Sequence, residues 1–127
     1  MGLNNAKGGT SSGNRLVGWL VSYEMDKMGK AFEIRAGRTL ISAENGKGRF
    51  ITVADTQLSS PHMAISASQK HRVLVQDIFS DDGSFLTRSD ADKESPINSP
   101  IEVGHGDWIR VGAKTRFQVC LIDMPAR

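Results

Sequence analysis

The chain has 127 residues, of which 39% are hydrophobic and 24% are charged, and its formal net charge is +2. This length is sufficient for one domain with a core of its own. No run of about 18 apolar residues is present, so the sequence predicts no membrane-spanning helix. Lysine and arginine are spread along the chain and are not interleaved with aromatic residues, which argues against nucleic-acid binding.

The cysteine content and the N-terminal sequence limit the cellular setting. Cys120 is the single cysteine, which excludes an internal disulfide and a cysteine-based zinc site. The N-terminus lacks the apolar segment of a secretory signal, and Ala6 stands where a myristoylation motif requires Ser or Thr. We expect a cytoplasmic protein without metal or cofactor, with a flexible tail over residues 1–14 and a short C-terminal tail over residues 124–127.

Short apolar or alternating segments, separated by turn residues, occupy residues 15–123 and indicate a single domain. The sequence predicts strands over residues 16–23, 31–35, 39–42, 50–53, 63–67, 73–77, 84–87, 101–103, 108–111 and 116–122. Residues 89–100 contain two prolines and several charges, so they are predicted to form an irregular excursion. No segment has sustained helical periodicity. The predicted fold is therefore all-β, a two-sheet antiparallel β-sandwich, with Trp19 and Trp108 in its core.

Two polar, turn-rich segments, Ser59–His62 and Ser80–Ser84, flank a predicted hairpin. Clustered Ser, Pro, Asp and Gly disfavour strands, so both segments are predicted to be loops. Because a hairpin brings its outer ends together, the two loops should lie side by side at one edge of the molecule. Loops held on a rigid scaffold often carry binding residues. Asp77 and Asp107 are interpreted as acids that brace turns.

The order of these segments resembles the forkhead-associated (FHA) domain, a β-sandwich that binds phosphothreonine peptides through loops at one end. The resemblance extends from about Trp19 to Ile122. It rests on the segments Ile51–Val53, Ser59–Ile65, Val75–Asp77, Ser80–Leu86 and Gly106–Gly112. Together, in this order and at this spacing, these motifs imply the FHA-type sandwich.

The phosphate-gripping arginine of the FHA pattern has no clear counterpart in this sequence. FHA domains usually have Gly-Arg at the end of the third strand, and that arginine binds the phosphate. Gly37-Arg38 matches the letters but precedes the predicted strand over residues 39–42. Counting back from Ile51 and Ser59 places the pattern on Ile41-Ser42-Ala43, which is the alignment we prefer. On this alignment the arginine is absent.

A second departure lies in the other loop. FHA domains commonly have Asn-Gly where this chain has Asp82-Gly83, and a carboxylate accepts but does not donate hydrogen bonds. Phosphothreonine carries about −1.5 to −2 charges, so Asp81 and Asp82 would repel it. Arg49 is the first candidate to supply the missing cation, ahead of Arg38 and Lys47.

The resemblance implies a set of binding residues and a set of bracing residues. Ser59 is the best-retained phosphate-type contact, against the alternative that it only makes a local turn. His62 is expected to brace the loops by hydrogen bonding, and Gly83 to supply a turn conformation. The expected partner- or phosphopeptide-binding residues are Ser59, Ser60, Arg49, Asp81, Asp82 and Ser84.

The sequence predicts binding rather than catalysis. Ser59, His62 and Asp107 are the residue types of a hydrolytic triad, but Ser59 and His62 are three residues apart and no Gly-x-Ser-x-Gly motif is present. No metal-ligand cluster or nucleotide fingerprint occurs either. The expected function is a signalling or scaffolding module that binds a protein partner with weakened or lost phosphothreonine dependence. Two alternatives remain open: a true phosphothreonine-peptide binder that uses Arg49, and a structural self-assembly module. Neither nucleic acid nor membrane is an expected partner.

Overall fold

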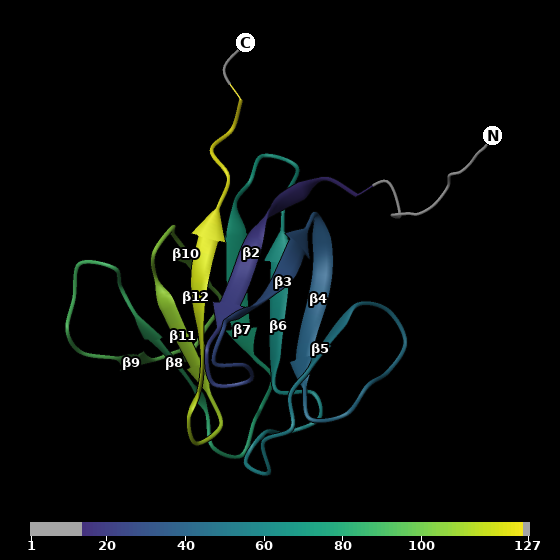
Figure 1. Ribbon diagram of the computed structural model, residues 1–127, viewed down its shortest axis with the longest axis vertical. Coiled ribbons are helices and arrows are strands. Elements are labelled where there is room, and N and C mark those ends of the chain that lie inside the picture. Colours follow the sequence, from purple (N-terminus) through teal and green to yellow (C-terminus); the bar gives the residue numbers. More distant parts are fainter. Residues whose placement is uncertain (1–13, 126–127) are drawn as a thin grey trace.

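The computed structural model describes residues 14–125, which form two β-sheets packed face to face (Figure 1). The first sheet has the strand order β10-β7-β6-β4-β5, with β10 Ile101–Val103, β7 Val73–Asp77, β6 Met63–Ala67, β4 Gly37–Ser42 and β5 Phe50–Thr52. The second has the order β3-β2-β12-β11-β8-β9, with β3 Lys30–Arg35, β2 Leu16–Ser22, β12 Thr115–Leu121, β11 Trp108–Val111, β8 Ser84–Thr87 and β9 Ser95–Pro96. The all-β sandwich prediction is confirmed.

The pairing differs from the sequence prediction at three places. Strands β4 and β5 run parallel, whereas the other neighbours are antiparallel. Gly37 and Arg38, which precede the strand predicted over residues 39–42, already belong to β4. Gly37 has a φ of 109°, which glycine adopts without steric cost, so Ala36 alone separates β3 from β4. Within the predicted excursion, Ser95–Pro96 adds a short edge strand to β8.

The core lies between the two sheets and is built from alternate residues of their strands. Phe117 is fully buried there and meets Phe32 edge to face, with ring centroids 6.1 Å apart. The prediction that Trp19 and Trp108 belong to the core is wrong. Both are half-buried on the outer face of the second sheet, because Leu20 next to Trp19 takes the inward direction of β2.

The described ends of the chain lie together at one end of the sandwich (Figure 1). The buried His71 ties them together: Arg15 Nε donates to His71 Nε2 at 2.6 Å, and His71 Nδ1 lies 2.6 Å from the carbonyl oxygen of Ile122. The flexible tail expected over residues 1–14 lies outside the described residues except for Asn14, whose amide donates to the Ala36 carbonyl at 2.7 Å. Nothing in the described part of the chain is a helix able to cross a membrane.

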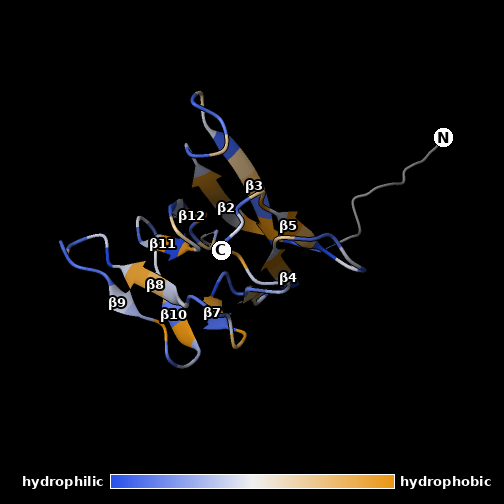
Figure 2. Ribbon diagram, turned by 90° about the horizontal axis from the view of Figure 1, so that it is seen from below, coloured by the Kyte–Doolittle hydropathy of each residue, from blue (hydrophilic) through white to orange (hydrophobic). Residues whose placement is uncertain are grey.

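The opposite end of the sandwich carries five connections between strands (Figure 1). We call it the loop end, and it consists of residues 23–29, 53–62, 78–83 and 112–114 and the beginning of the connection 43–49, which then returns alongside β4 to the parallel strand β5. Figure 2 views the molecule from this side and shows that hydrophobic residues concentrate in the strands, whereas much of the connecting chain is hydrophilic. The loop end is therefore a mainly polar surface held by a rigid β scaffold.

Candidate binding site at the loop end

The β5–β6 and β7–β8 loops lie side by side, as the sequence predicts. Ser59 Oγ accepts a hydrogen bond from the backbone N–H of Asp81 at 3.0 Å. His62 Nε2 lies 2.8 Å from the carbonyl oxygen of Gly83. These two contacts join segments that are more than twenty residues apart in sequence, and they form the centre of the candidate site.

His62 is fully buried between the two loops. Its Nδ1 accepts the backbone N–H of Ser59 at 3.0 Å, so the ring proton is assigned to Nε2, which donates to the carbonyl of Gly83. Asp77 Oδ1 is 3.9 Å from Nε2, beyond hydrogen-bond distance. Gly83 has a φ of 84°, a left-handed conformation in which glycine carries no Cβ penalty. The His62 ring thus fixes the separation of the two loops.

Asp77, the last residue of β7, organises the β7–β8 loop from below. Its carboxylate accepts the backbone N–H of Ser80 at 3.0 Å, the hydroxyl of Ser80, and the hydroxyl of Ser84 at 2.6 Å. Burial acts to raise the pKa of Asp77, but these hydrogen bonds outweigh it and hold the pKa below its usual value. Asp107 likewise accepts from three donors near the β10–β11 turn. Both acids brace turns, as the sequence predicts.

The serines expected to contact a partner differ in availability. Ser59 is half-buried, and its hydroxyl oxygen accepts one hydrogen bond while its proton has no acceptor among residues 14–125. Ser60 is exposed, and the Ser60–Pro61 peptide bond is cis. Ser84 is 2% exposed and donates its hydroxyl to Asp77, so the structure does not support a partner contact for Ser84.

Ala43 occupies the position beside Ser59 where a phosphate-binding cation would be expected. The backbone N–H of Ala43 donates to the carbonyl of Ser59 at 3.2 Å. Arg38, by contrast, pairs with Ser66 near the beginning of β4, at the end of that strand remote from Ala43. The methyl side chain of Ala43 has neither charge nor hydrogen-bonding capacity.

Arg49 points away from Ser59. Its Nη2 donates to the carbonyl of Ala36 at 2.9 Å, and a Cβ on Gly37 would come within 2.7 Å of the same nitrogen. The reason is the parallel pairing of β4 with β5, which places Arg49 beside Leu40 rather than beyond the end of β4. The structure therefore does not support the expectation that Arg49 supplies the missing cation.

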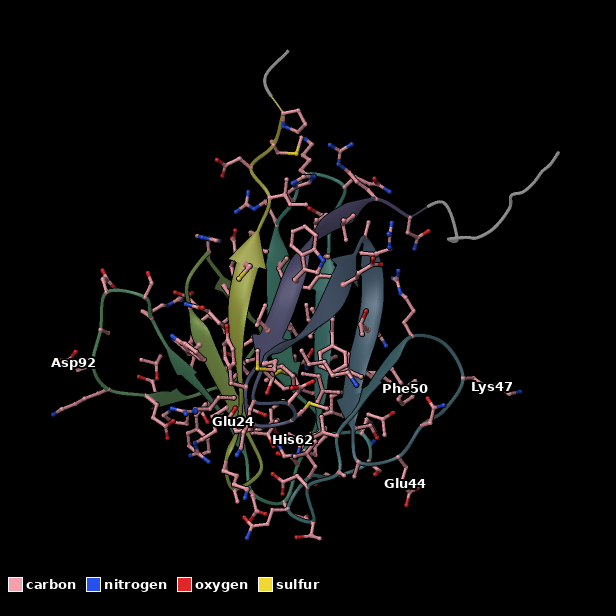
Figure 3. The ribbon with its side chains drawn as sticks, viewed as in Figure 1. Glu24, Glu44, Lys47, Phe50, His62 and Asp92 are labelled. Carbon is pink, nitrogen blue, oxygen red and sulfur yellow. The ribbon has the colours of Figure 1, made fainter. Side chains whose placement is uncertain are left out.

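The remaining charges near the two loops are mostly negative. Lys47 extends away from the body of the domain, whereas Glu44 and His62 lie toward the loop end (Figure 3). Asp81 and Asp82 are exposed, and neither carboxylate has a donor among the described residues. The space beside Ser59 thus combines neutral hydroxyls with uncompensated carboxylates.

Phe79 was missed by the sequence analysis. Its side chain is 99% exposed, and its φ of 47° is unusual for an aromatic residue. The following residue, Ser80, is fixed to Asp77, so the loop holds Phe79 outward in a defined position. An apolar pair, Ile78-Phe79, placed directly before a polar turn was the available signal in the sequence.

A hollow of about 500 Å³ lies at the loop end, outside the candidate site described above. It is lined by Glu24, Met25, Val53, Ala54, Asp55, Thr56, Gln57, Ala113, Lys114 and Thr115. Glu24 forms an ion pair with Arg116 at 2.9 Å, and Asp55 accepts the hydroxyl of Thr115 at 2.9 Å. Because its acidic side chains already have partners within the domain, we assign this hollow no ligand.

Comparison with known proteins gives one consistent result. No family model and no curated protein sequence matches the chain. Among solved structures, the FHA domain of the CT664 protein from Chlamydia trachomatis is 17% identical with a TM-score of 0.70, covering 84% of this chain and 98% of that one. The solution structure of the FHA domain of a hypothetical protein from Arabidopsis thaliana is 22% identical with a TM-score of 0.66, covering 96% and 99%.

A third structure comes from a structural and functional analysis of phosphothreonine-dependent FHA domain interactions. It is 22% identical with a TM-score of 0.64, and the match covers 85% of this chain and 99% of that one. All three matches cover at least 84% of this chain and at least 98% of the other. The protein therefore has the fold of the FHA domain.

Proposed function

We propose that this protein is a non-enzymatic interaction module for signalling or scaffolding, whose loop end binds a partner protein with weakened or lost dependence on phosphothreonine. The fold supports the general role, because similar structures include FHA domains studied for phosphothreonine-dependent interactions. The hydrogen bonds between the β5–β6 and β7–β8 loops support the location, because they pre-organise this surface before a partner arrives.

The proposal of reduced phosphate dependence rests on the positions of two residues. Ala43 lies beside Ser59, and Arg49 is bound to the carbonyl of Ala36. A phosphothreonine brings about −1.5 to −2 charges, which neutral hydroxyls hold less strongly than a guanidinium does. Losing one charge-assisted hydrogen bond costs about 1.5–3 kcal/mol, or roughly ten- to hundredfold in affinity. The exposed carboxylates of Asp81 and Asp82 add repulsion.

The β7–β8 loop suits an unphosphorylated partner. Phe79 presents a whole aromatic side chain to solvent, and aromatic anchors contribute much of the binding energy of protein interfaces. Asp81 and Asp82 follow it as unpaired carboxylates. A partner with an apolar pocket and a nearby lysine or arginine would complement both features.

A titration with two matched peptide pools tests the proposal. One pool is degenerate around a fixed phosphothreonine, and its twin has threonine at the same position. We expect the phosphorylated pool to bind within roughly threefold of its twin, because Ala43 offers no cation beside Ser59 and Arg49 is bound to the carbonyl of Ala36. A preference of roughly a hundredfold for the phosphorylated pool would overturn the proposal.

A further inference from the structure

A groove of about 280 Å³ crosses the outer face of the first sheet, away from Ser59 and His62. It is lined by Arg38, Ala64, Ser66, Leu74, Val75, Gln76, Ile78 and Pro100. Leu74 of β7, which lines the groove, is 41% exposed. The groove is thus a recess of mixed polarity in the wall of the domain, and it meets the loop end only at Ile78.

Strand register explains why the groove exists. Arg38 of β4, Ser66 of β6 and Leu74 of β7 lie opposite one another in one cross-strand row. The adjacent row on the same face contains Leu40, Ala64 and Gln76. Small residues on the central strand are therefore flanked on both sides by long ones. Because neighbouring strands are about 4.8 Å apart, the flanking strands lie roughly 10 Å from each other, which leaves room for one row of inserted side chains.

The groove carries one uncompensated positive charge. The guanidinium of Arg38 is exposed and has no carboxylate or hydrogen-bond acceptor among residues 14–125. On the same face, Arg72 is neutralised by Glu102, with Nη2 and Oε1 2.9 Å apart. Burial of apolar surface next to a free arginine favours a ligand that has an apolar group and an anionic group together.

We propose that this groove binds an extended segment of a partner protein in which a carboxylate side chain is two residues from an apolar side chain. The carboxylate would pair with Arg38 in the row of Ser66. The apolar side chain would enter the recess next to Ala64, Ile78 and Pro100. The two rows are two residues apart along β6, about 6.7 Å, which equals the spacing of same-face side chains in an extended peptide. Apart from Ile78, this surface shares no residue with the loop end, so a single partner can use both.

The probes are three fluorescent nonapeptide pools without threonine, with central Glu-x-Leu, Leu-x-Glu or Lys-x-Leu and neutral degenerate flanks. Binding is followed by anisotropy. We expect one of the two glutamate pools to bind roughly tenfold tighter than the lysine pool, and the winning order reports the direction of the segment. Equal binding of all three pools would overturn the proposal.

Two variants locate the binding. Ser66→Trp fills the groove from the solvent side, and Arg38→Ala removes the cation. Each should weaken binding of the preferred glutamate pool by roughly tenfold, whereas Arg38→Lys should retain part of it. Ala31→Trp makes the same kind of change at an exposed position on β3 of the other sheet and should bind like the parent. Undiminished binding by Ser66→Trp would contradict the assignment.

Amide chemical shifts separate this proposal from that for the loop end. Shifts on peptide addition at Ser66 and Leu74 support the groove. Shifts confined to residues 59–62 and 80–83 overturn it, because the glutamate pools would then occupy the loop end. Sedimentation tests a different occupant: self-association of the parent that Ser66→Trp abolishes would assign the groove to a second copy of the chain and refute the partner segment.

Discussion

His62 Nε2 and the carbonyl oxygen of Gly83 are 2.8 Å apart, so one fully buried imidazole connects two loops that are 21 residues apart in sequence. The other ring nitrogen accepts the backbone N–H of Ser59. Both nitrogens are thus used within the domain, and neither is available for proton transfer to a ligand. This arrangement gives His62 a structural task.

Replacing His62 with alanine should lower the free energy of unfolding by about 1–3 kcal/mol, because it leaves the partly buried N–H of Ser59 and carbonyl of Gly83 without their partners. Urea denaturation measures the change. His105→Ala is the matched control, because His105 is exposed and its ring accepts a single hydrogen bond, from the N–H of Leu121 at 3.0 Å. Equal denaturation midpoints for His62→Ala and the parent would refute the bracing role.

Asp77→Asn should destabilise the domain at pH 7 by about 1–3 kcal/mol, because an amide replaces the carboxylate that accepts from Ser80 and Ser84. The folded-state pKa of Asp77 lies below the unfolded value of about 3.9. The ionised Asp77 therefore contributes fully to folding stability above the unfolded-state pKa. This contribution is lost as the pH falls through the folded-state pKa.

The measurement is the unfolding free energy of the parent and of Asp77→Asn from pH 7 down to pH 3. The gap between the two proteins should stay constant near neutrality and shrink below about pH 4. Asp82→Asn, which removes no hydrogen bond made by the described residues, should match the parent at pH 7. A gap that grows on acidification would show that the carboxylate does not have this role.

Phe79→Asn should raise the free energy of unfolding by roughly 0.5–1 kcal/mol. Phenylalanine at a φ of 47° carries backbone strain, and its fully exposed ring recovers nothing by packing. Asparagine tolerates this conformation better. Met28→Asn is the control, because Met28 is 89% exposed without a positive φ. A stability gain in both variants, or in neither, would argue against strain at residue 79.

The strands could be predicted from sequence because they rely on local alternation and turn residues. The segments 63–67, 73–77 and 84–87 appear in the structure with the predicted bounds. The direction of Arg49 could not be predicted, because it follows from the parallel pairing of β4 with β5, a non-local property. The burial of Ser84 was missed for a similar reason: whether a residue at a loop boundary faces a partner or the core depends on which strand register the loop enters.

The site residues also divide into those that the local sequence could predict and those that depend on non-local strand pairing. Asp77 was recognisable as a turn-bracing acid because it precedes a Ser-rich turn, and the groups that donate to its carboxylate are near it in sequence. Counting back from Ile51 and Ser59 assigned the arginine position of the FHA pattern to Ala43, and Ala43 does lie beside Ser59 in the structure. The groove beside Arg38 was not recognisable, because it needs the alignment of three strands across the sheet.

Restoring a cation beside Ser59 should create phosphate dependence. In Ala43→Arg, a guanidinium would stand next to the Ser59 hydroxyl, and Asp82→Asn would remove a repelling carboxylate and add an amide donor. Each change should strengthen binding of a phosphothreonine peptide pool separately, and the double variant should prefer that pool over its unphosphorylated twin by roughly ten- to hundredfold. Calorimetry with the two matched pools measures the preference.

Ala43→Met separates charge from bulk, because methionine has a similar length without a charge. It should show no preference for the phosphorylated pool, and the gain in Ala43→Arg should fall as salt is raised, since a partly exposed ion pair is screened. A phosphate preference in the parent protein would point to a different residue. If the parent already prefers the phosphorylated pool a hundredfold and Arg49→Ala abolishes that preference, Arg49 must leave the carbonyl of Ala36 on binding and act as the phosphate ligand.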